Sequence, residues 1–144
     1  MELYVLYMQD RNNFTEFKKF ILHQLELLAK EIEIKKNNEH ECVAYCSDFL
    51  IRVRDKSLKM DITKEEYNMD LDYEIWFDLY YSENQSTYQM MMKFMETLIS
   101  KNQEQCIVLF NGCRSVLERR NKVIIGDRSM LPYLNVKYID QKLE

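Results

Sequence analysis

The glycines and serines of this chain exclude several kinds of active site. A phosphate-binding loop or a dinucleotide fingerprint needs glycines close together. Gly112 and Gly126, the only glycines among the 144 residues, lie far apart in the sequence. No serine stands in the G-x-S-x-G pattern of a nucleophile elbow. P-loop nucleotide hydrolases and Rossmann dehydrogenases are therefore excluded, and we predict no bound cofactor.

The histidines and cysteines do not form a metal-binding pattern either. The cysteines contain no C-x-x-C pair; they are Cys42, Cys46, Cys106 and Cys113. Only His23 and His40 could complete a metal site with them. We expect His23 on the first helix, at the edge of its apolar face, and His40 in a solvated loop. We expect four reduced thiols, with Cys42 and Cys46 as small core residues on one face of a strand. The sequence thus predicts neither metal ligands nor catalytic residues.

Carboxylates offer the remaining route to catalysis, and they concentrate in residues 61–83. This stretch holds eight acidic residues and one base, Lys64, although the formal net charge of the whole chain is only −4. Two neighbouring carboxylates perform general acid–base chemistry when one of them is desolvated. We expect these side chains to be solvated, so a small acid–base enzyme is the third of three functional hypotheses.

The same stretch has the clearest strand pattern in the chain. Residues of one parity are apolar or aromatic: Leu71, Tyr73, Ile75, Phe77, Leu79 and Tyr81. Residues of the other parity are mostly acidic and form a second row: Asp70, Asp72, Glu74, Trp76, Asp78 and Tyr80. This alternation predicts a half-buried antiparallel strand over residues 70–81, with the first row on the core and the second row in solvent.

We predict that the second row binds another protein. Tryptophan and tyrosine supply large contact areas in interfaces, and carboxylates steer a basic partner toward its site. Trp76 and Tyr80 would be the anchors of this interface. The steering groups would be Asp72, Glu74 and Asp78.

A second interpretation of this row stays open. The row would then be an ordinary solvated face, on which Arg52 and Arg54 of a neighbouring strand pair with the acids across the sheet. The loop 55–69 or the C-terminal tail would cover Trp76. The two interpretations differ in whether Trp76 is available to a partner.

Periodicity predicts the other elements of the fold. Apolar residues recur at helical spacing from Phe14 to Ile32, behind a capping box that begins at Asn13, and predict a helix over residues 13–34. A second helix is predicted over 85–101, with its methionine run, residues 90–92, as core filling rather than as a plastic binding groove. Strands are predicted over 2–8, 42–54, 106–110, 113–119 and 123–125, with a type I′ turn at Asn111-Gly112.

This succession predicts an α+β fold in a single domain, residues 1–144, with two helices on one face of an antiparallel sheet. The order β-α-β-β-α-β, followed by a C-terminal hairpin, is loosely ferredoxin-like. No window is long and apolar enough for a transmembrane helix, and residues 1–8 have the pattern of a strand rather than of a signal peptide. We therefore expect a cytoplasmic protein that does not bind membranes. The mild negative charge argues against nucleic-acid binding.

The C-terminal part of the chain has the pattern of a meander that follows a helix. Its segments are 106–112, 116–119 and 123–125, and they come after the helix 85–101. This part resembles the small immunity proteins of bacterial polymorphic-toxin systems, which are cytoplasmic α+β proteins with such a meander and an asparagine-glycine turn. Cys113 stands where that pattern has an acid, and Asn121 where it has glycine. The resemblance implies a protein that binds and neutralises a cognate toxin inside the producing cell, and it carries over no catalytic residues.

Three hypotheses about function follow from these patterns. The first is an immunity protein that neutralises a toxin domain by protein–protein contact; an acidic inhibitor suits a basic target such as a nuclease. The second is a regulatory or scaffolding module that forms a homodimer through a sheet edge or through the Met-rich helix. The third is the small acid–base enzyme. The oligomeric state stays open at this stage.

Overall fold

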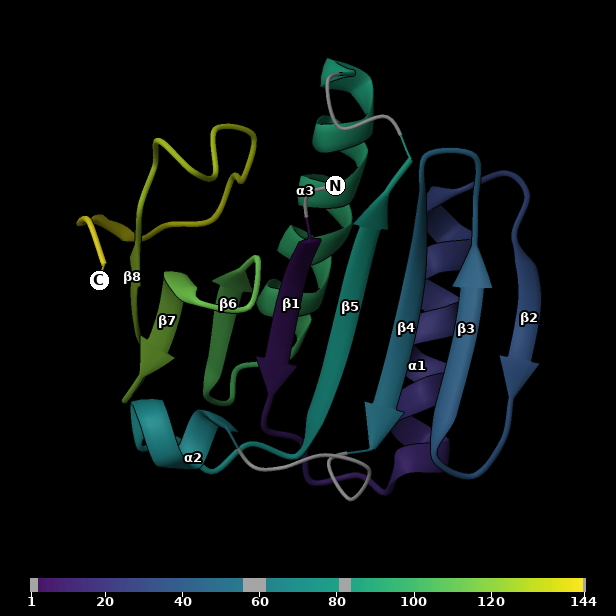
Figure 1. The fold of residues 1–144 in the computed structure, drawn as a ribbon, viewed down its shortest axis with the longest axis horizontal. Helices are drawn as coiled ribbons and strands as arrows, with labels where there is room; N and C mark the ends of the chain where they lie inside the picture. Colours follow the sequence, from purple (N-terminus) through teal and green to yellow (C-terminus); the bar gives the residue numbers. More distant parts are fainter. Residues whose placement is uncertain (1–2, 56–61, 81–83, 144) are drawn as a thin grey trace.

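A nine-stranded sheet runs through the computed structural model, which describes residues 3–55, 62–80 and 84–143 (Figure 1). Its strands are β1 (Leu3–Met8), β2 (Glu33–Asn37), β3 (Glu41–Tyr45), β4 (Phe49–Asp55), β5 (Tyr73–Leu79), β6 (Cys106–Phe110), β7 (Arg114–Arg120), β8 (Val123–Gly126) and β9 (Ile139–Asp140). The helices are α1 (Phe14–Leu28), α2 (Ile62–Tyr67) and α3 (Gln85–Lys101). Within the described residues, none of these helices has both the length and the apolar character needed to cross a membrane. The α+β class that the two periodicities predict is confirmed.

The sheet places β1 near its middle, between two strands that are distant from it in the sequence. The order across the sheet is β2-β3-β4-β5-β1-β6-β7-β8-β9. Neighbouring strands are antiparallel, except β8 and β9, which are parallel. The register sets Val5 of β1 opposite Trp76 of β5 on one side and opposite Leu109 of β6 on the other. The acidic strand β5 therefore lies between β1 and β4 in the interior of the sheet.

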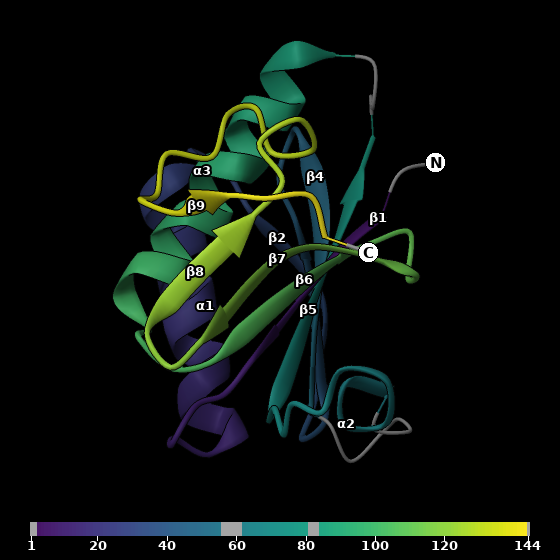
Figure 2. The ribbon, with the colours of Figure 1, turned by 90° about the vertical axis from the view of Figure 1, so that its left-hand side faces the viewer.

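The helices α1 and α3 pack beside each other on one face of the sheet and bury the main core (Figure 2). Phe17 and Ile21, spaced at one helical turn, are fully buried on the inner side of α1. At the centre of the core, the rings of Phe49, Phe77 and Phe94 have centroids 5.9–6.2 Å apart. These aromatic contacts join β4, β5 and α3, and they hold the apolar row of β5 on the helix side, as its alternation predicts.

A smaller apolar cluster lies on the opposite face of the sheet, where α2 packs (Figure 2). Met69 and Leu71, in the segment after α2, are each 1% exposed and cluster with Ile107 and Leu109 of β6. Tyr67, the last residue of α2, packs against this cluster. The prediction of two helices on one face is therefore incomplete, because a third helix covers part of the face that we expected to be open.

The helix predicted over residues 13–34 is too long. Asn13 caps α1 as predicted, with its side-chain oxygen accepting a hydrogen bond from Glu16 N at 2.9 Å. The helix ends at Leu28, because Ala29 adopts an extended conformation with φ −104° and ψ 137°. The chain then forms the edge strand β2, which the sequence did not predict. All five residues of β2 are exposed, so β2 lacks the alternation by which a half-buried strand is recognised.

The strand predicted over residues 42–54 is in fact a hairpin. β3 ends at Tyr45 and β4 begins at Phe49, and Cys46 N donates to Phe49 O at 3.0 Å across the turn. The turn contains Ser47 and Asp48 but neither glycine nor proline, the residues that most clearly mark turns. Together with β2, this hairpin adds two strands before β5. The predicted order β-α-β-β-α-β is therefore incomplete, although α3, β6, β7 and β8 follow as expected.

The first turn of the C-terminal meander has the predicted geometry. Asn111 and Gly112 have φ of 50° and 75°, as a type I′ turn requires. Cys113 N donates to Phe110 O at 3.3 Å and closes the turn. Asn111 Oδ1 also accepts a hydrogen bond from Leu3 N at 2.9 Å. The turn is thereby tied to the start of the central strand.

The second turn of the meander offers a test of backbone strain. Asn121 and Lys122 have φ of 50° and 68°, and a left-handed conformation costs a residue with a Cβ roughly 1–2 kcal/mol. Glycine avoids that cost but loses more entropy on folding. Lys122→Gly should therefore raise the free energy of unfolding in urea by about 0.5–1 kcal/mol. Lys122→Ala removes the same charge but keeps the Cβ, and an equal gain in this control would contradict the backbone explanation.

Arg119 of β7 holds the C-terminal end of α3 from inside the protein. It is only 3% exposed. Its guanidinium donates to Ile99 O at 3.0 Å, to Glu104 O at 2.8 Å and to Asn102 O. The last carbonyls of a helix lack partners within the helix, and a cation at this end is favoured by the helix dipole. Arg119 thus links the meander to the helix that precedes it.

Loss of this arginine should be costly because three carbonyl oxygens would lose their donor. Arg119→Met should lower the free energy of unfolding by about 3 kcal/mol or more. Arg119→Lys keeps the charge with fewer donors and should lose less. Urea denaturation of the three proteins measures both effects, and a loss below about 1 kcal/mol in the methionine variant would show that the carbonyls find other partners.

Candidate interaction surface

The strand β5 presents its even-numbered residues on the sheet face opposite α1 and α3. The cross-strand register arranges this face in rows. The first row contains Leu50, Asp78 and Leu3, the second Arg52, Trp76 and Val5, and the third Arg54, Glu74 and Tyr7. The rows differ in exposure, and that difference decides which of the predicted residues a partner could reach.

Alternating charges fill the third row. Glu41 of β3 accepts a hydrogen bond from Arg54 Nε at 2.5 Å, and its carboxylate lies 3.0 Å from Lys36 Nζ. Arg54 Nη1 lies 4.0 Å from the Glu74 carboxylate. Burial acts to raise the pKa of Glu41, but the hydrogen bonds and charges of Lys36 and Arg54 outweigh it, so that this pKa lies below its ordinary value. Glu41 and Glu74 are 7% and 4% exposed. The cross-strand pairing expected of Arg54 is confirmed, but the expectation that Glu74 is a solvated steering group is wrong.

The last residue of the third row, Tyr7, lies near α2. Tyr7 is opposite Glu74 and, like Tyr67, packs against the small cluster of Met69, Leu71, Ile107 and Leu109. Burial is the main reason that the pKa of Tyr7 is raised to about 12, and the charges of Glu74, Tyr67 and Glu66 add to the shift. Tyr7 is half-buried beside the buried Glu74, so this end of the face is largely covered.

The two acids before β5 do not extend the row. Asp72 Oδ2 accepts a hydrogen bond from Asp10 N at 2.9 Å, so Asp72 holds the segment after β1. Asp70 is exposed, and its carboxylate lies 3.9 Å from Lys64 Nζ of α2. The expectation of one continuous acidic row in solvent is wrong, because β5 begins only at Tyr73 and the chain before it turns to other contacts.

Trp76, Asp78 and Tyr80 occupy the part of the face that is less covered. Trp76 is half-buried, and the guanidinium carbon of Arg54 lies 5.1 Å from its ring centroid. Asp78 is half-buried as well, and Tyr80 is 44% exposed. With their half-buried neighbours they form what we call the face patch: Tyr45, Leu50, Arg52, Trp76, Asp78 and Tyr80. Tryptophan, tyrosine and arginine are the residue types that most often dominate binding energy in interfaces.

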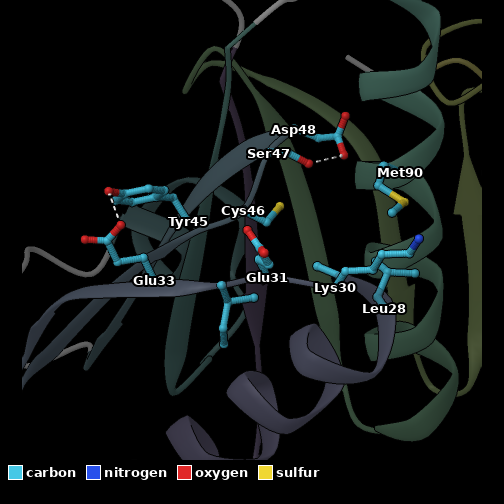
Figure 3. Close-up of a pocket in the computed structure, with 11 residues that line it drawn as sticks. Leu28, Lys30, Glu31, Glu33, Tyr45, Cys46, Ser47, Asp48 and Met90 are labelled. Atoms are coloured by element: carbon cyan, nitrogen blue, oxygen red, sulfur yellow. Dashed lines mark hydrogen bonds between the residues drawn. The ribbon is translucent and has the colours of Figure 1, made fainter.

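A groove opens at the end of the sheet next to the face patch (Figure 3). It has a volume of about 1090 Å³ and lies between the end of α1, the start of β2, the β3–β4 turn and Met90 of α3. Its apolar lining comes from Leu28, Ala29, Ile32, Cys46 and Met90. Tyr45 lines the groove and also belongs to the face patch. No sequence pattern pointed to this groove, because it exists only where α1 ends early and the chain turns between β3 and β4.

Neither histidine lies in the core, and Cys46 lies just beyond the end of β3 rather than on the strand with Cys42. Cys42, Cys46 and Cys106 are buried, Cys113 is exposed, and all four are free thiols. Cys42 and Cys46 belong to the main core. Burial raises the pKa of the Cys106 thiol to about 11. His23 and His40 are exposed, and residues 3–55, 62–80 and 84–143 contain no group of three His, Cys, Asp or Glu side chains placed to hold a metal ion.

Comparisons of the chain with protein-family models, with curated proteins and with solved structures found no match to any of them. The likeness of the C-terminal segments to immunity proteins therefore stays a prediction.

Removal of Arg54 should reveal the cost of the buried charges. In Arg54→Met, Glu41 and Glu74 lose the cation between them, and we expect a loss of about 3 kcal/mol in the free energy of unfolding at pH 7. The low pKa of Glu41 contributes stability above the ordinary carboxylate pKa of about 4.3, and this contribution is lost as the pH falls through the folded pKa. The difference between variant and parent should therefore shrink below about pH 4.

Urea unfolding at about pH 7 and about pH 3 measures both differences. Arg52→Met, in the neighbouring row, is the matched control, because Arg52 forms no ion pair with any residue in the described ranges. It should change stability much less and with little dependence on pH. A loss in Arg54→Met that is equal at the two pH values would contradict the electrostatic role.

Proposed function

We propose that this chain is an immunity protein, which binds and neutralises a cognate bacterial toxin domain by protein–protein contact, without catalysis, in the cytoplasm of the cell that makes the toxin. The observation that carries the proposal is the face patch, which lies on the sheet face that α1 and α3 leave uncovered. The resemblance of the C-terminal meander to polymorphic-toxin immunity proteins supplies the kind of partner.

The face patch has the composition and support expected of an interface centre. Trp76 and Tyr80 offer aromatic area and Arg52 offers a planar donor, and these residue types dominate binding hot spots. Trp76 stands on a central strand with the Arg54 guanidinium 5.1 Å from its ring. A ring held in place before binding loses little conformational entropy when a partner arrives.

Of the three acids predicted to attract a basic partner, only Asp78 keeps that role, and two acids of α2 join it. Asp72 and Glu74 are engaged within the fold. Glu65 and Glu66 of α2 are exposed, and Asp78 lies within the face patch. With the net charge of −4, these acids favour a basic target such as a nuclease, with an association rate that falls as salt is added.

The surfaces suggested for a homodimer are poorly suited to one. Met91 and Met92 of α3 are fully buried in the core, so the Met-rich face does not meet a second copy. The edge strand β2 carries Lys35 and Lys36, and its pairing with β3 shifts register between Ile34 and Lys36. Lysines and bulges at a sheet edge discourage pairing between molecules. The scaffolding hypothesis therefore has less support than toxin binding.

The acid–base enzyme of the third hypothesis needs a carboxylate that titrates near neutral pH. Glu41 is buried, but Lys36 and Arg54 hold its pKa below the ordinary value. Glu74 shares the same arginine. These carboxylates are better suited to holding strands together than to moving protons.

The proposal predicts a gene for a toxin domain immediately upstream of this chain's gene, and that domain is the partner to use in the test. Co-expression should restore growth to cells that produce this domain, and the two purified proteins should form a stable complex. Trp76→Ala should cost about 2 kcal/mol or more in binding free energy, measured by calorimetry, because it removes the central ring of the face patch. Tyr80→Ala removes a ring that is 44% exposed and should weaken binding with less effect on the fold.

Leu27→Ala is the matched control, because Leu27 is 69% exposed on α1, on the covered side of the sheet. It should leave the affinity unchanged. Urea unfolding of each variant separates loss of binding from loss of structure. A gene neighbourhood without a toxin-bearing reading frame, or unchanged affinity in both Trp76→Ala and Tyr80→Ala, would remove the proposal.

A further inference from the structure

The groove at the end of the sheet combines an apolar floor with acidic walls (Figure 3). Cys46, on the floor, is 5% exposed. The charged residues that line the groove are Lys30, Glu31, Glu33 and Asp48. Three acids therefore face one base around a cavity of about 1090 Å³, a size that admits side chains of a partner.

Two of these acids form no ion pair with any residue in the ranges 3–55, 62–80 and 84–143. Glu31 makes no hydrogen bond or ion pair with any residue in the described ranges. Asp48 accepts one hydrogen bond, from the Ser47 hydroxyl at 3.4 Å, and it too makes no ion pair within those ranges. In the view of Figure 3, the Lys30 ammonium lies on the Met90 side of the groove, away from Glu31. The groove thus has carboxylates in place for a cation that the described part of the chain does not supply.

The third acid connects the groove to the face patch. Glu33 accepts a hydrogen bond from the Tyr45 hydroxyl at 2.7 Å, and Tyr45 belongs to both surfaces. Burial, followed by the charges of Cys46, Tyr45 and Asp78, raises the pKa of Tyr80. Tyr80 N also donates to Asp48 O at 3.5 Å. The face patch and the groove therefore meet at the β3–β4 turn, so that a partner seated on the face patch lies next to the groove.

The chemistry of the lining selects the occupant. Lysine and arginine have long apolar stems and a charged head, and an apolar floor between carboxylates matches both parts. A carboxylate-bearing side chain would meet like charge in the same place. A neutral apolar side chain would leave the two acids without a cation.

We propose that the groove receives a lysine or arginine side chain, next to an apolar residue, from a protruding segment of the protein that the face patch binds. Glu31 and Asp48 bind the charged head, and Leu28, Ile32 and Met90 contact the stem and the apolar neighbour. This inference rests on the proposed function and extends it, because it names a second contact region and the chemistry of the partner's segment.

The groove is tested without any toxin by titrating a capped tetrapeptide, Ac-Ala-Leu-Arg-Ala-NH₂, into the full-length protein labelled with nitrogen-15. Amide shifts should change saturably at residues 28–33 and 45–48. The neutral peptide Ac-Ala-Leu-Gln-Ala-NH₂ should bind at least about threefold more weakly, because it lacks the charge. Equal binding of the two peptides, or shifts confined to other parts of the protein, would overturn the proposal.

Charge variants of the groove make the test sharper. Glu31→Gln and Asp48→Asn should each raise the Kd of the arginine peptide about threefold, and the double variant about tenfold. Lys30→Gln should lower the Kd about threefold, because it removes the one base that repels the peptide. Glu26→Gln, on an exposed position of α1 that does not line the groove, is the control and should change nothing. An unchanged Kd in both Glu31→Gln and Lys30→Gln would contradict the proposal.

The same variants separate this inference from the proposed function. If the peptide binds as expected and the upstream toxin domain does not, the groove stands and the immunity function fails. If the toxin domain binds through Trp76 and its affinity is the same for the Glu31→Gln/Asp48→Asn double variant, the function stands and the groove fails.

Discussion

Two long helices cover one face of the sheet, and the character of the other face follows from this constraint. Between α1, α3 and the sheet lies a core of close aromatic contacts that fixes which residues of β4 and β5 point inward. The remaining residues of these strands must either find partners on the opposite face or stay in contact with solvent. The protein uses both solutions, at different ends of the same strands.

At one end, charges and a short helix close the open face. Arg54 lies between Glu41 and Glu74, and α2 packs on the neighbouring cluster. Buried carboxylates are tolerated only when a cation is placed against them, so the strands β3, β4 and β5 must keep their register there. At the other end, Trp76 is half-buried and Tyr80 is 44% exposed, and the groove opens beside them. The surface that we propose for a partner is the end of the sheet where the fold leaves aromatic side chains half-buried or exposed.

The elements that could be predicted are those in which the spacing of apolar residues along the sequence matches the side that is buried. The apolar row of β5 alternates because one side of the strand faces the core, and α3 repeats its buried residues at helical spacing because one side packs on the sheet. The strand β2 could not be predicted, because it is exposed along its whole length and its existence depends on pairing with β3. The helix prediction ran past Leu28 because Ile32 continues the helical spacing, although it packs against the core from an extended segment.

The candidate site also has a part that the sequence predicted and a part that it could not predict. The sequence predicted the residue types of the site, because Trp76 and Tyr80 alternate with apolar residues along one strand and lie on the same side as the acids. Which of the acids are engaged within the fold was decided by residues far away in the chain, since Arg54 pairs with Glu74 and Asp10 N donates to Asp72. The groove depended on even more distant parts, because α1, the β3–β4 turn and α3 meet only in the folded protein.

By itself, the sequence determined the α+β class, the strand β5 with its apolar row inward, the helix α3 and the asparagine-glycine turn. Each of these depends on local periodicity or on the backbone preference of one or two residues. Only the tertiary structure decided the strand order, the extra edge strand, the burial of Glu74 and the groove beside Tyr45. These depend on contacts between segments that are distant in sequence. The free energy of such a contact depends on both residues of the pair, so the local pattern around either residue does not predict it.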